Sequence, residues 1–285
     1  MSEDGSAGGG VSKGFVVRAV ARFDAGVGET REDRVAAEEP LEIRVGGDVV
    51  AITMRTPGRD HDLALGFLLG ERIIASLADV GTISHCGRPG DEGYGNAIDV
   101  APGPGARVDP DKRALRRGSV TTSSCGVCGR DTIEDLLRDV VPRAPTPMST
   151  AMFLRAARAL EETQRLFKAT GGVHGAVALD AAGAVLAAAE DVGRHNAVDK
   201  VLGALLRENK RAALLMVSGR VSFEIVQKAA VSAVGAVAGV SAPTGLAVDL
   251  AERAGVVLAG FVRGNHVNVY AHAAAVTGTD AVTGS

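Results

Sequence analysis

The chain has 285 residues, of which 46% are hydrophobic and 23% are charged, and its formal net charge is −3. This hydrophobic content excludes an intrinsically disordered chain, and the interspersed, slightly acidic charge argues against DNA or RNA as the main partner. Because only 3% of the residues are aromatic and none is tryptophan, the core must be built from Val, Ala, Leu and Ile. The length allows one large or two modest domains.

The chain begins with MSEDGSAGGG, which is acidic and glycine-rich and unlike a signal peptide. We therefore expect a disordered tail over residues 1–12. The longest apolar run, residues 229–240, is too short to span a bilayer, so no membrane partner is expected. Three cysteines do not make a disulfide framework, and the sequence predicts a cytoplasmic protein whose thiols stay reduced.

Residues 13–118 are expected to form a small α+β domain, on the basis of β-rich runs and one stretch of apolar residues at helical spacing. The predicted elements are a strand at 15–23, a hairpin over 41–54 that turns at Gly46-Gly47-Asp48, a helix over 60–76, and loops over 86–105 with a strand at 96–101. Residues 119–145 are expected to hold a cysteine loop and a linking helix near 130–140.

Residues 146–275 show a more regular pattern, and residues 276–285 are expected to form a tail. The predicted elements are a helix over 150–170 that stops at Gly171-Gly172, a hairpin over 173–190 that turns at 180–183, a helix over 197–206, a strand at 212–218, a helix over 221–234, a strand at 236–242, a short helix after Pro243, and strands at 256–262 and 267–271. This order predicts a three-layer α/β domain with a mixed sheet, in a protein that is α/β, or α+β overall.

Two of the three cysteines, Cys125 and Cys128, lie in the glycine-rich stretch TTSSCGVCGR. The helix expected after them would place both thiols near a helix N-terminus, where the partial positive charge and Arg130 favour the thiolate. Acidic residues that follow oppose this effect, so we expect a moderate lowering of the thiol pKa. A thiolate at such a site is a competent nucleophile toward sulfur.

Other interpretations of the cysteine pair stay open at this point. A zinc site needs four ligands, and it would require Cys86 and the adjacent His85 to meet Cys125 and Cys128 in the fold. A thioredoxin-like pair belongs at a strand-to-helix turn of a βαβ unit, whereas this pair lies between the two halves of the chain. Two ordinary surface cysteines are the remaining alternative.

Polar residues follow two predicted strands at the points where helices begin. Asp191, Arg194 and His195 follow one strand, and Ser218-Gly219-Arg220 follow another. Open α/β sheets bind ligands at the carboxyl ends of their strands, and exposed N–H groups with arginine suit an anion such as phosphate. His174, after a glycine pair, is more simply interpreted as a structural histidine.

Seven strings together resemble the FdhD/NarQ family of formate dehydrogenase accessory proteins, which are also described as sulfur carriers. They are MRTPGRDHDLALGFLLGE, SSCGVCG, TGGVHGA, EDVGRHNAVDKVLG, SGRVSFEIVQKA, SAPTGLAVDLA and GFVRGNHVNVY. They run in order from about residue 40 to residue 270, and several are long and unusual, so they are far more specific than a cysteine pair. One departure is Arg72, where glycine is expected.

The resemblance implies a sulfurtransferase that accepts persulfide sulfur from a cysteine desulfurase and passes it to the molybdenum of a bis(molybdopterin guanine dinucleotide) cofactor, which apo-formate dehydrogenase then receives. Cys125 would carry the persulfide, with Cys128 as its partner. The cofactor-binding stretch of the family falls on Phe261, Val262, Arg263, Gly264, Asn265 and His266. Our own inference adds Asp191, Arg194, His195, Ser218, Gly219 and Arg220, which would hold the phosphates of the guanine dinucleotide arms. We also expect a homodimer and no intrinsic zinc.

The second half also resembles the cytidine deaminase fold. Zinc deaminases use His-x-Glu at one helix start and Pro-Cys-x-x-Cys at the next. Here the corresponding junctions are His195-Asn196-Ala197 and Ser218-Gly219-Arg220. The first lacks the glutamate and the second lacks both cysteines, so deamination is disfavoured. Two alternatives stay open: a zinc-dependent hydrolase that uses Cys125, Cys128 and a histidine, and a chaperone that binds the cofactor without using its thiols.

Overall fold

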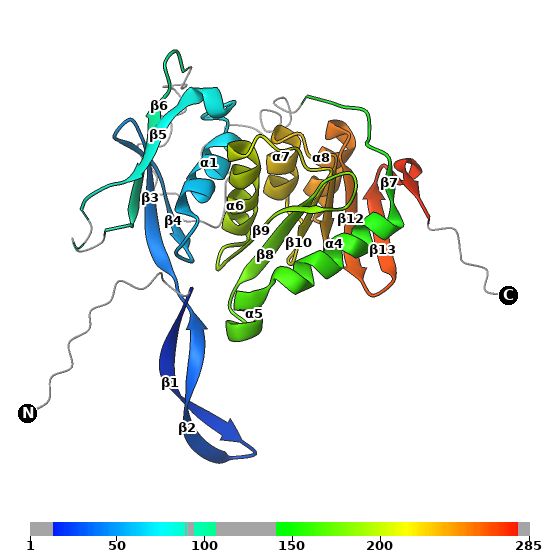
Figure 1. The fold of residues 1–285 in the computed structure, drawn as a ribbon. Helices are drawn as coiled ribbons and strands as arrows, with labels where there is room; N and C mark the ends of the chain where they lie inside the picture. The colour runs from blue at the N-terminus through cyan, green and yellow to red at the C-terminus, as the bar shows by residue number, and fades with distance from the viewer. Residues whose placement is uncertain (1–13, 89, 91–93, 107–140, 279–285) are drawn as a thin grey trace, which may run out of the picture.

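The computed structural model describes residues 14–88, 90, 94–106 and 141–278. In this part of the chain, a four-stranded sheet with one helix lies beside a six-stranded sheet that helices cover on both faces, and a long hairpin projects away from both (Figure 1). The expected mixed α/β class is confirmed. The domain boundary predicted near residue 118 and the helix expected near 130–140 lie outside those ranges, and the division into domains stays a prediction.

The projecting hairpin consists of β1 (Phe15–Asp24) and β2 (Val27–Ala36), which pair antiparallel along their whole length. Between them, Ala25 and Gly26 have φ values of 48° and 89°, the left-handed region that tight hairpin turns use. The strand expected at 15–23 is confirmed, and β2 is an addition to the predicted elements. Nearly every residue of β2 is exposed, so its sequence, VGETREDRVA, lacks the alternation of a half-buried strand.

The four-stranded sheet has the order β4-β3-β6-β5. Its elements are β3 (Glu39–Val45), β4 (Asp48–Arg55), a short 3-10 helix η1 (Leu77–Asp79), β5 (Val80–His85) and β6 (Ala97–Pro102). The predicted hairpin over 41–54 and strand at 96–101 are confirmed, and β5 is an addition. Helix α1 (Asp60–Gly70) covers the sheet with its leucines. It ends at Gly70 instead of the expected residue 76, and the chain turns at Arg72, whose φ of 54° is a conformation that favours glycine.

The six-stranded sheet has the order β13-β12-β11-β10-β8-β9. Its strands are β8 (His174–Leu179), β9 (Val185–Asp191), β10 (Leu214–Val217), β11 (Ala236–Gly239), β12 (Val257–Arg263) and β13 (His266–Ala271). β10, β11 and β12 run parallel, and the other neighbours are antiparallel, so the sheet is mixed as expected. A 3-10 helix η2 (Ala273–Ala275) follows the sheet. After it, β14 (Val276–Thr277) pairs in parallel with β7 (Met148–Ser149), so the first two residues of the predicted tail form a short strand.

Helices cover both faces of this sheet (Figure 1). α4 (Thr150–Thr163) packs on one face, where Phe153 and Leu160 meet apolar side chains of β8, β10 and β12. The other face carries α6 (Arg194–Arg207), α7 (Phe223–Val231) and α8 (Gly245–Ala254). The sequence predicted a helix at each of these places, because every one has an apolar side at helical spacing.

The helix expected over 150–170 is interrupted at Gln164, after which α5 (Arg165–Thr170) begins. The carboxylate of Glu190, from β9, accepts hydrogen bonds from the N–H groups of Leu166 and Phe167 at 2.8 and 2.7 Å. A carboxylate that satisfies the first N–H groups of a helix stabilises a new helix start. Since Glu190 is distant in sequence, the helical pattern alone could not reveal the break.

Helices α1 and α6 cross at a contact between backbones, where both helices carry glycine. A Cβ on Gly66 would lie 1.9 Å from the carbonyl oxygen of Asp199, and a Cβ on Gly203 would lie 1.8 Å from the carbonyl oxygen of Asp62. Any side chain at either position would push the helices apart. These two glycines therefore set the distance between the four-stranded sheet and the six-stranded sheet.

We expect Gly203→Ala to lower the free energy of unfolding by about 3 kcal/mol, because overpacking of a close contact costs on this order. The matched control is Gly245→Ala in α8, where an added Cβ meets no atom within 4 Å. Denaturant unfolding of both variants measures the difference. Equal stability of the two variants would show that the helices can separate without cost.

Candidate functional site

The topology of the large sheet brings the predicted site residues to one edge. Because β10, β11 and β12 are parallel, their carboxyl ends lie at the same edge. β8 runs antiparallel to β10, and β9 antiparallel to β8, so the start of β8 and the end of β9 lie there too. From β12 to β9 this edge extends about 19 Å, since neighbouring strands lie about 4.8 Å apart. We call it the site edge.

The middle of the site edge is a junction between the ends of β10 and β8. Ser218 and Gly175 exchange hydrogen bonds: the N–H of Ser218 donates to the Gly175 carbonyl and the N–H of Gly175 donates to the Ser218 hydroxyl, both at 2.9 Å. Gly219 faces His174, whose Nδ1 would lie 3.5 Å from a Cβ at that position. Arg220 is exposed. Three of the predicted residues thus lie together, next to the histidine interpreted as structural.

His195, in the first turn of α6, lies beside the start of α7. Its Nε2 is 3.3 Å from the Ser222 hydroxyl and 3.7 Å from a carboxylate oxygen of Glu224. Burial lowers the pKa of His195 to about 4, with Arg194 and Lys228 acting in the same direction against Glu224. The imidazole is therefore neutral near pH 7, and it contributes hydrogen bonds instead of positive charge.

Two further pKa values describe the electrostatics of this part of the edge. Burial alone would raise the pKa of Glu224, but hydrogen bonds from Ser222 and from the backbone N–H of Glu224 itself, with His195 and Arg194 nearby, lower it overall. Burial, and then the positive charge of Arg194, lowers the pKa of His174. Both histidines therefore favour the neutral form, and the positive charge of the edge comes from its arginines.

The starts of α6 and α7 have backbone N–H groups that no side chain of the N-cap residue satisfies. Gly193 is the N-cap of α6, and Ser222, at the N-cap of α7, makes no capping hydrogen bond. By contrast, the hydroxyl of Thr244 caps α8 by accepting from Ala247. Uncapped helix starts with arginine beside them suit anionic groups.

Asp191 lies beneath the start of α6 and is fully buried. Its carboxylate pairs with Lys200 at 2.7 Å and accepts hydrogen bonds from the N–H groups of Thr56 and Gly193 and from the amide of Asn196, at 3.1, 2.8 and 3.1 Å. These contacts hold the turn that leads into α6. The contacts show that Asp191 positions Gly193 and the start of α6. A role of Asp191 in cofactor binding stays a prediction.

The stretch from Phe261 to His266 comprises the end of β12, the turn at Gly264-Asn265 and the start of β13, at one end of the site edge. Phe261 and Gly264 have positive φ values of 52° and 56°. Val262 is buried, and the other five residues of the stretch, including Gly264, are exposed. The turn and α4 together line a groove of about 490 Å³.

The groove adds three residues that sequence reasoning missed. Arg158, Glu161 and Gln164 from α4 and its end face Arg263, Gly264 and Asn265 of the turn across it. In the sequence, Arg158 and Glu161 belong to the polar side of an amphipathic helix, which usually means a solvated face. Only the position of α4 against the edge of the sheet shows that this side borders a groove.

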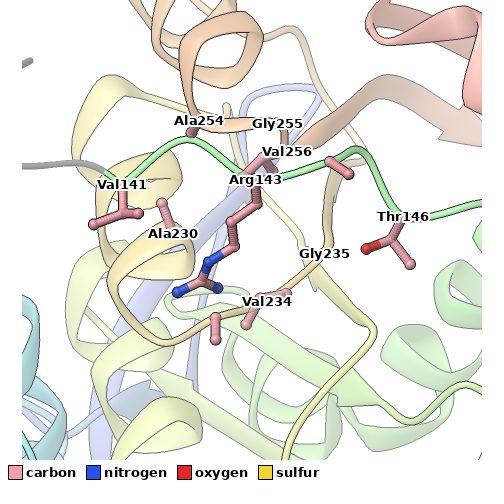
Figure 2. Close-up of a pocket in the computed structure, with 11 residues that line it drawn as sticks. Val141, Arg143, Thr146, Ala230, Val234, Gly235, Ala254, Gly255 and Val256 are labelled. Carbon is pink, nitrogen blue, oxygen red and sulfur yellow. The ribbon is translucent and has the colours of Figure 1, made fainter.

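Cys125 and Cys128 lie outside the described residues. The chain re-enters the described structure at Val141, at the edge of the sheet opposite the site edge. There the 141–146 segment and the loops before β11 and β12 enclose a small cavity of about 50 Å³, and Figure 2 shows Arg143 reaching toward Val234. Thirteen positions separate Cys128 from Val141, and a fully extended chain of that length reaches about 45 Å.

Cys86, the third cysteine, follows β5 in the small sheet and is half-buried. Its N–H donates to the carbonyl of Ala97, and the neighbouring His85 lies 3.8 Å from Asp60. Among the described residues, no group of three His, Cys, Asp or Glu side chains is placed to hold a metal ion. The zinc site that would include Cys125 and Cys128 stays untested. None of the described helices is both long enough and apolar enough to cross a membrane.

Comparison with known proteins places the chain among related sequences along most of its length. The model of the FdhD/NarQ family matches residues 36–277. A protein of Anaeromyxobacter dehalogenans strain 2CP-1, named sulfur carrier protein FdhD, is 55% identical over 251 residues, which is 84% of this chain and 87% of that protein. A protein of Streptomyces coelicolor with the same name is 44% identical over 266 residues, covering 90% of this chain and 93% of its own.

A solved structure shares the fold. The crystal structure of a candidate formate dehydrogenase accessory protein from Desulfotalea psychrophila superposes with a TM-score of 0.73 and 24% sequence identity. The match covers 92% of this chain and 99% of that one.

Proposed function

The chain belongs to the FdhD/NarQ family, and from this premise we propose that it is a sulfur carrier that supports the maturation of formate dehydrogenase. The names of the related proteins support sulfur carriage, and the name of the structural neighbour supports the link to formate dehydrogenase. The observation that carries the cofactor part of the proposal is the shared site edge. The turn from Phe261 to His266, two uncapped helix starts and three arginines lie along it.

In the proposed reaction, the Cys125 thiolate attacks the outer sulfur of a persulfide on a cysteine desulfurase. The desulfurase cysteine leaves as a thiolate, and Cys125 then carries the persulfide, with Cys128 as its partner or resolving thiol. The Cys128 thiolate then attacks the inner sulfur of this persulfide, so that a Cys125–Cys128 disulfide forms and the terminal sulfur leaves at the sulfide level. That sulfur passes to the molybdenum of bis(molybdopterin guanine dinucleotide), which is cargo on its way to apo-formate dehydrogenase, and a thiol reductant restores the two cysteines. The protein's own residues bind and orient this cargo, and no intrinsic zinc takes part.

The residues of the site edge fit a phosphorylated cargo. Arg194, Arg220 and Arg263 supply positive charge, and the N–H groups at the start of α6 supply hydrogen-bond donors. At the start of α7, the carboxylate of Glu224 already accepts from its own N–H group. Gly219 leaves room for close backbone approach. His195 is neutral near pH 7, because burial lowers its pKa to about 4, so the arginines and N–H groups must balance the phosphate charge.

The experiment that tests the proposal is a sulfur-loading assay. The full chain is incubated with a cysteine desulfurase and cysteine, and its intact mass is measured before and after reduction. We expect the gain of one labile sulfur atom, which reduction removes. A chain that never gains sulfur, yet still supports formate dehydrogenase maturation when both loop cysteines are alanine, would instead be a chaperone that only binds the cofactor.

A zinc-dependent deaminase is the weaker alternative. We propose that the second half shares the cytidine deaminase fold, but the position where such an enzyme carries its glutamate is Ala197, which is fully buried among apolar side chains. The position of the second motif is Ser218-Gly219-Arg220. Stoichiometric zinc bound to the purified protein would favour the alternative.

We expect Glu161 to recognise the guanine base, because a carboxylate can accept two hydrogen bonds from the N–H groups of guanine that adenine does not offer. Glu161→Gln should weaken the binding of guanosine diphosphate by about tenfold or more, since a hydrogen bond to a charged group contributes about 1.5–3 kcal/mol. Adenosine diphosphate serves as the second probe, and its weaker binding should not change. Isothermal titration calorimetry measures both.

The chain offers a matched control in Glu162, the next residue of α4, which is exposed and does not line the groove. Glu162→Gln should bind guanosine diphosphate like the unchanged chain. Equal binding by both variants would remove Glu161 from the proposal, whereas absence of guanosine diphosphate binding by the unchanged chain would count against the cofactor assignment itself.

A further inference from the structure

His174 is a histidine of the site edge that the proposed function leaves unused. It begins β8, and β8 lies between β9 and β10 in the sheet (Figure 1). Because neighbouring strands lie about 4.8 Å apart, His174 stands between the start of α6, which follows β9, and the Ser218-Gly219-Arg220 turn, which follows β10. Antiparallel pairing places His174 opposite Asp191, and Gly219 faces its ring.

The side chain of His174 points toward the face of the sheet that carries α6 and α7. Side chains alternate along a strand, and Ala176 and Ala178 of β8 belong to the apolar core on that face. Gly175, the residue after His174, faces the opposite side, where a Cβ would lie 3.0 Å from the side chain of Gln164. His174 therefore lies on the same side of the sheet as the uncapped start of α6.

The ring of His174 is half-buried, and neither of its nitrogens has a hydrogen-bond partner within the described part of the chain. By contrast, His195 bonds the Ser222 hydroxyl, and His272 bonds the carbonyl of Ala251. A structural histidine normally has such partners, because a buried polar group without one costs free energy. The ring of His174 is therefore available to a ligand at the middle of the site edge.

The charges around His174 favour its neutral form when no anion is bound. Burial lowers its pKa first, and the positive charge of Arg194 lowers it further, while Asp191 acts in the opposite direction. Asp191 pairs with Lys200 at 2.7 Å, so the attraction of its charge for a proton on His174 is largely cancelled. Arg220, which follows Gly219, adds positive charge on the β10 side.

The other titratable groups of the neighbouring elements have partners of their own. On α6 and α7, His195 and Glu224 lie 3.7 Å apart, and on β9 the carboxylate of Glu190 accepts from the start of α5. His195 has a pKa of about 4 and stays neutral near pH 7. Between the ends of β9 and β10, His174 is thus the group whose charge can change when an anion binds near neutral pH.

We propose that His174 binds the diphosphate of a guanine dinucleotide arm and takes up a proton from solvent as it binds. This inference rests on the proposed function, which supplies the phosphorylated cargo. A bound diphosphate balances the Arg194 charge that disfavours the imidazolium, and its oxygens accept hydrogen bonds from the charged ring. His174 then has a higher pKa in the bound state, so binding is tighter below that pKa and weakens as the pH rises through it. The proton returns to solvent when the cargo leaves.

The test measures the binding of guanosine diphosphate mannose to the full chain by isothermal titration calorimetry at pH 8 and at pH 6. Both phosphates of this probe are diesters, as in the cargo, so the probe itself does not titrate in this range. We expect the unchanged chain to bind about tenfold more tightly at pH 6, the effect of one hydrogen bond to a charged group. Titrations in buffers with different ionisation enthalpies measure the proton uptake directly.

His174→Gln keeps a neutral hydrogen-bond donor but cannot take up the proton. This variant should bind the probe equally at both pH values and take up no proton. The control His61→Gln, at an exposed position of α1, should behave like the unchanged chain. Proton uptake that disappears in His266→Gln and persists in His174→Gln would assign the proton to the turn after β12 and overturn the proposal.

The pKa of His174, measured by NMR in the unchanged chain, keeps the test decisive if the variant folds poorly. We expect this pKa to rise when guanosine diphosphate mannose is added. Binding without a change in the pKa and without proton uptake overturns the inference and leaves the proposed function standing. Absence of binding at both pH values overturns the inference together with the cofactor assignment, while the sulfur-loading assay still tests sulfur carriage.

Discussion

Cys125→Ala should gain no labile sulfur when it is incubated with a cysteine desulfurase and cysteine, whereas Cys128→Ala should still gain it. The reason is that a persulfide can form only on the thiolate that attacks the donor, and we assign that attack to Cys125. Intact mass before and after reduction measures the sulfur. The effect is all or none, since an alanine side chain cannot carry sulfur.

Cys86→Ala is the internal control for this assay, because Cys86 is the remaining cysteine of the chain. It is half-buried beside the small sheet, and its substitution should leave sulfur uptake unchanged. If Cys125→Ala gains sulfur while Cys128→Ala does not, the roles of the two loop cysteines are reversed. Uptake by both loop variants would end the persulfide proposal.

Lys200→Met should lower the free energy of unfolding by about 3–5 kcal/mol, the usual cost of removing one partner from a buried ion pair. Lys200 and Asp191 lie 2.7 Å apart and have side-chain exposures of 2% and 0%. Lys200 also donates to the carbonyl of Thr56 at 2.7 Å. Methionine retains much of the shape of lysine but leaves the Asp191 charge without its cation.

The matched control for Lys200→Met is Lys210→Met. Lys210 and Glu208 also lie 2.7 Å apart, but their side chains are 46% and 40% exposed. Exposed pairs contribute little to stability, so the control should unfold like the unchanged chain. Denaturant unfolding compares the two variants, and a Lys200→Met variant as stable as the control would show that Asp191 needs no cation.

A second substitution separates the ion pair from the shape of the side chain. Asp191→Asn/Lys200→Met removes both charges and should recover part of the stability that Lys200→Met loses, because no charge is then left buried and unpaired. Recovery should be incomplete, since the new amide cannot accept from both the N–H of Thr56 and the N–H of Gly193 as the carboxylate does.

The same buried contacts give a role to a string whose function the sequence did not suggest. Thr56 and Arg59 belong to the string MRTPGRDHDLALGFLLGE. The N–H of Thr56 donates to Asp191, its hydroxyl accepts from the N–H of Val192, and Arg59 bonds the carbonyl of Ala188. This string therefore holds the end of β9 and the start of α6 in place. Its residues position elements of the site edge but are not themselves part of that edge.

Local patterns in the sequence predicted most of the secondary structure, because apolar periodicity is a property of neighbouring residues. The helices α4, α6, α7 and α8 and the strands of the large sheet were expected close to where they lie. Two elements were not predicted correctly, because local periodicity does not report their causes. β2 has no buried face, and the helix expected over 150–170 is interrupted at Gln164 because Glu190 caps a new helix. At Arg72 the expectation of glycine agrees with its positive φ.

What the sequence by itself determined is the list of elements, the family strings and the candidate residues, since each depends on residues close together in the chain. What only the tertiary structure decided is which of them meet. Thr56 bonds Asp191 across 135 positions, and Glu161 borders the same groove as Asn265. Such contacts depend on strand order and helix packing, which bring distant segments to one edge and which no local pattern encodes.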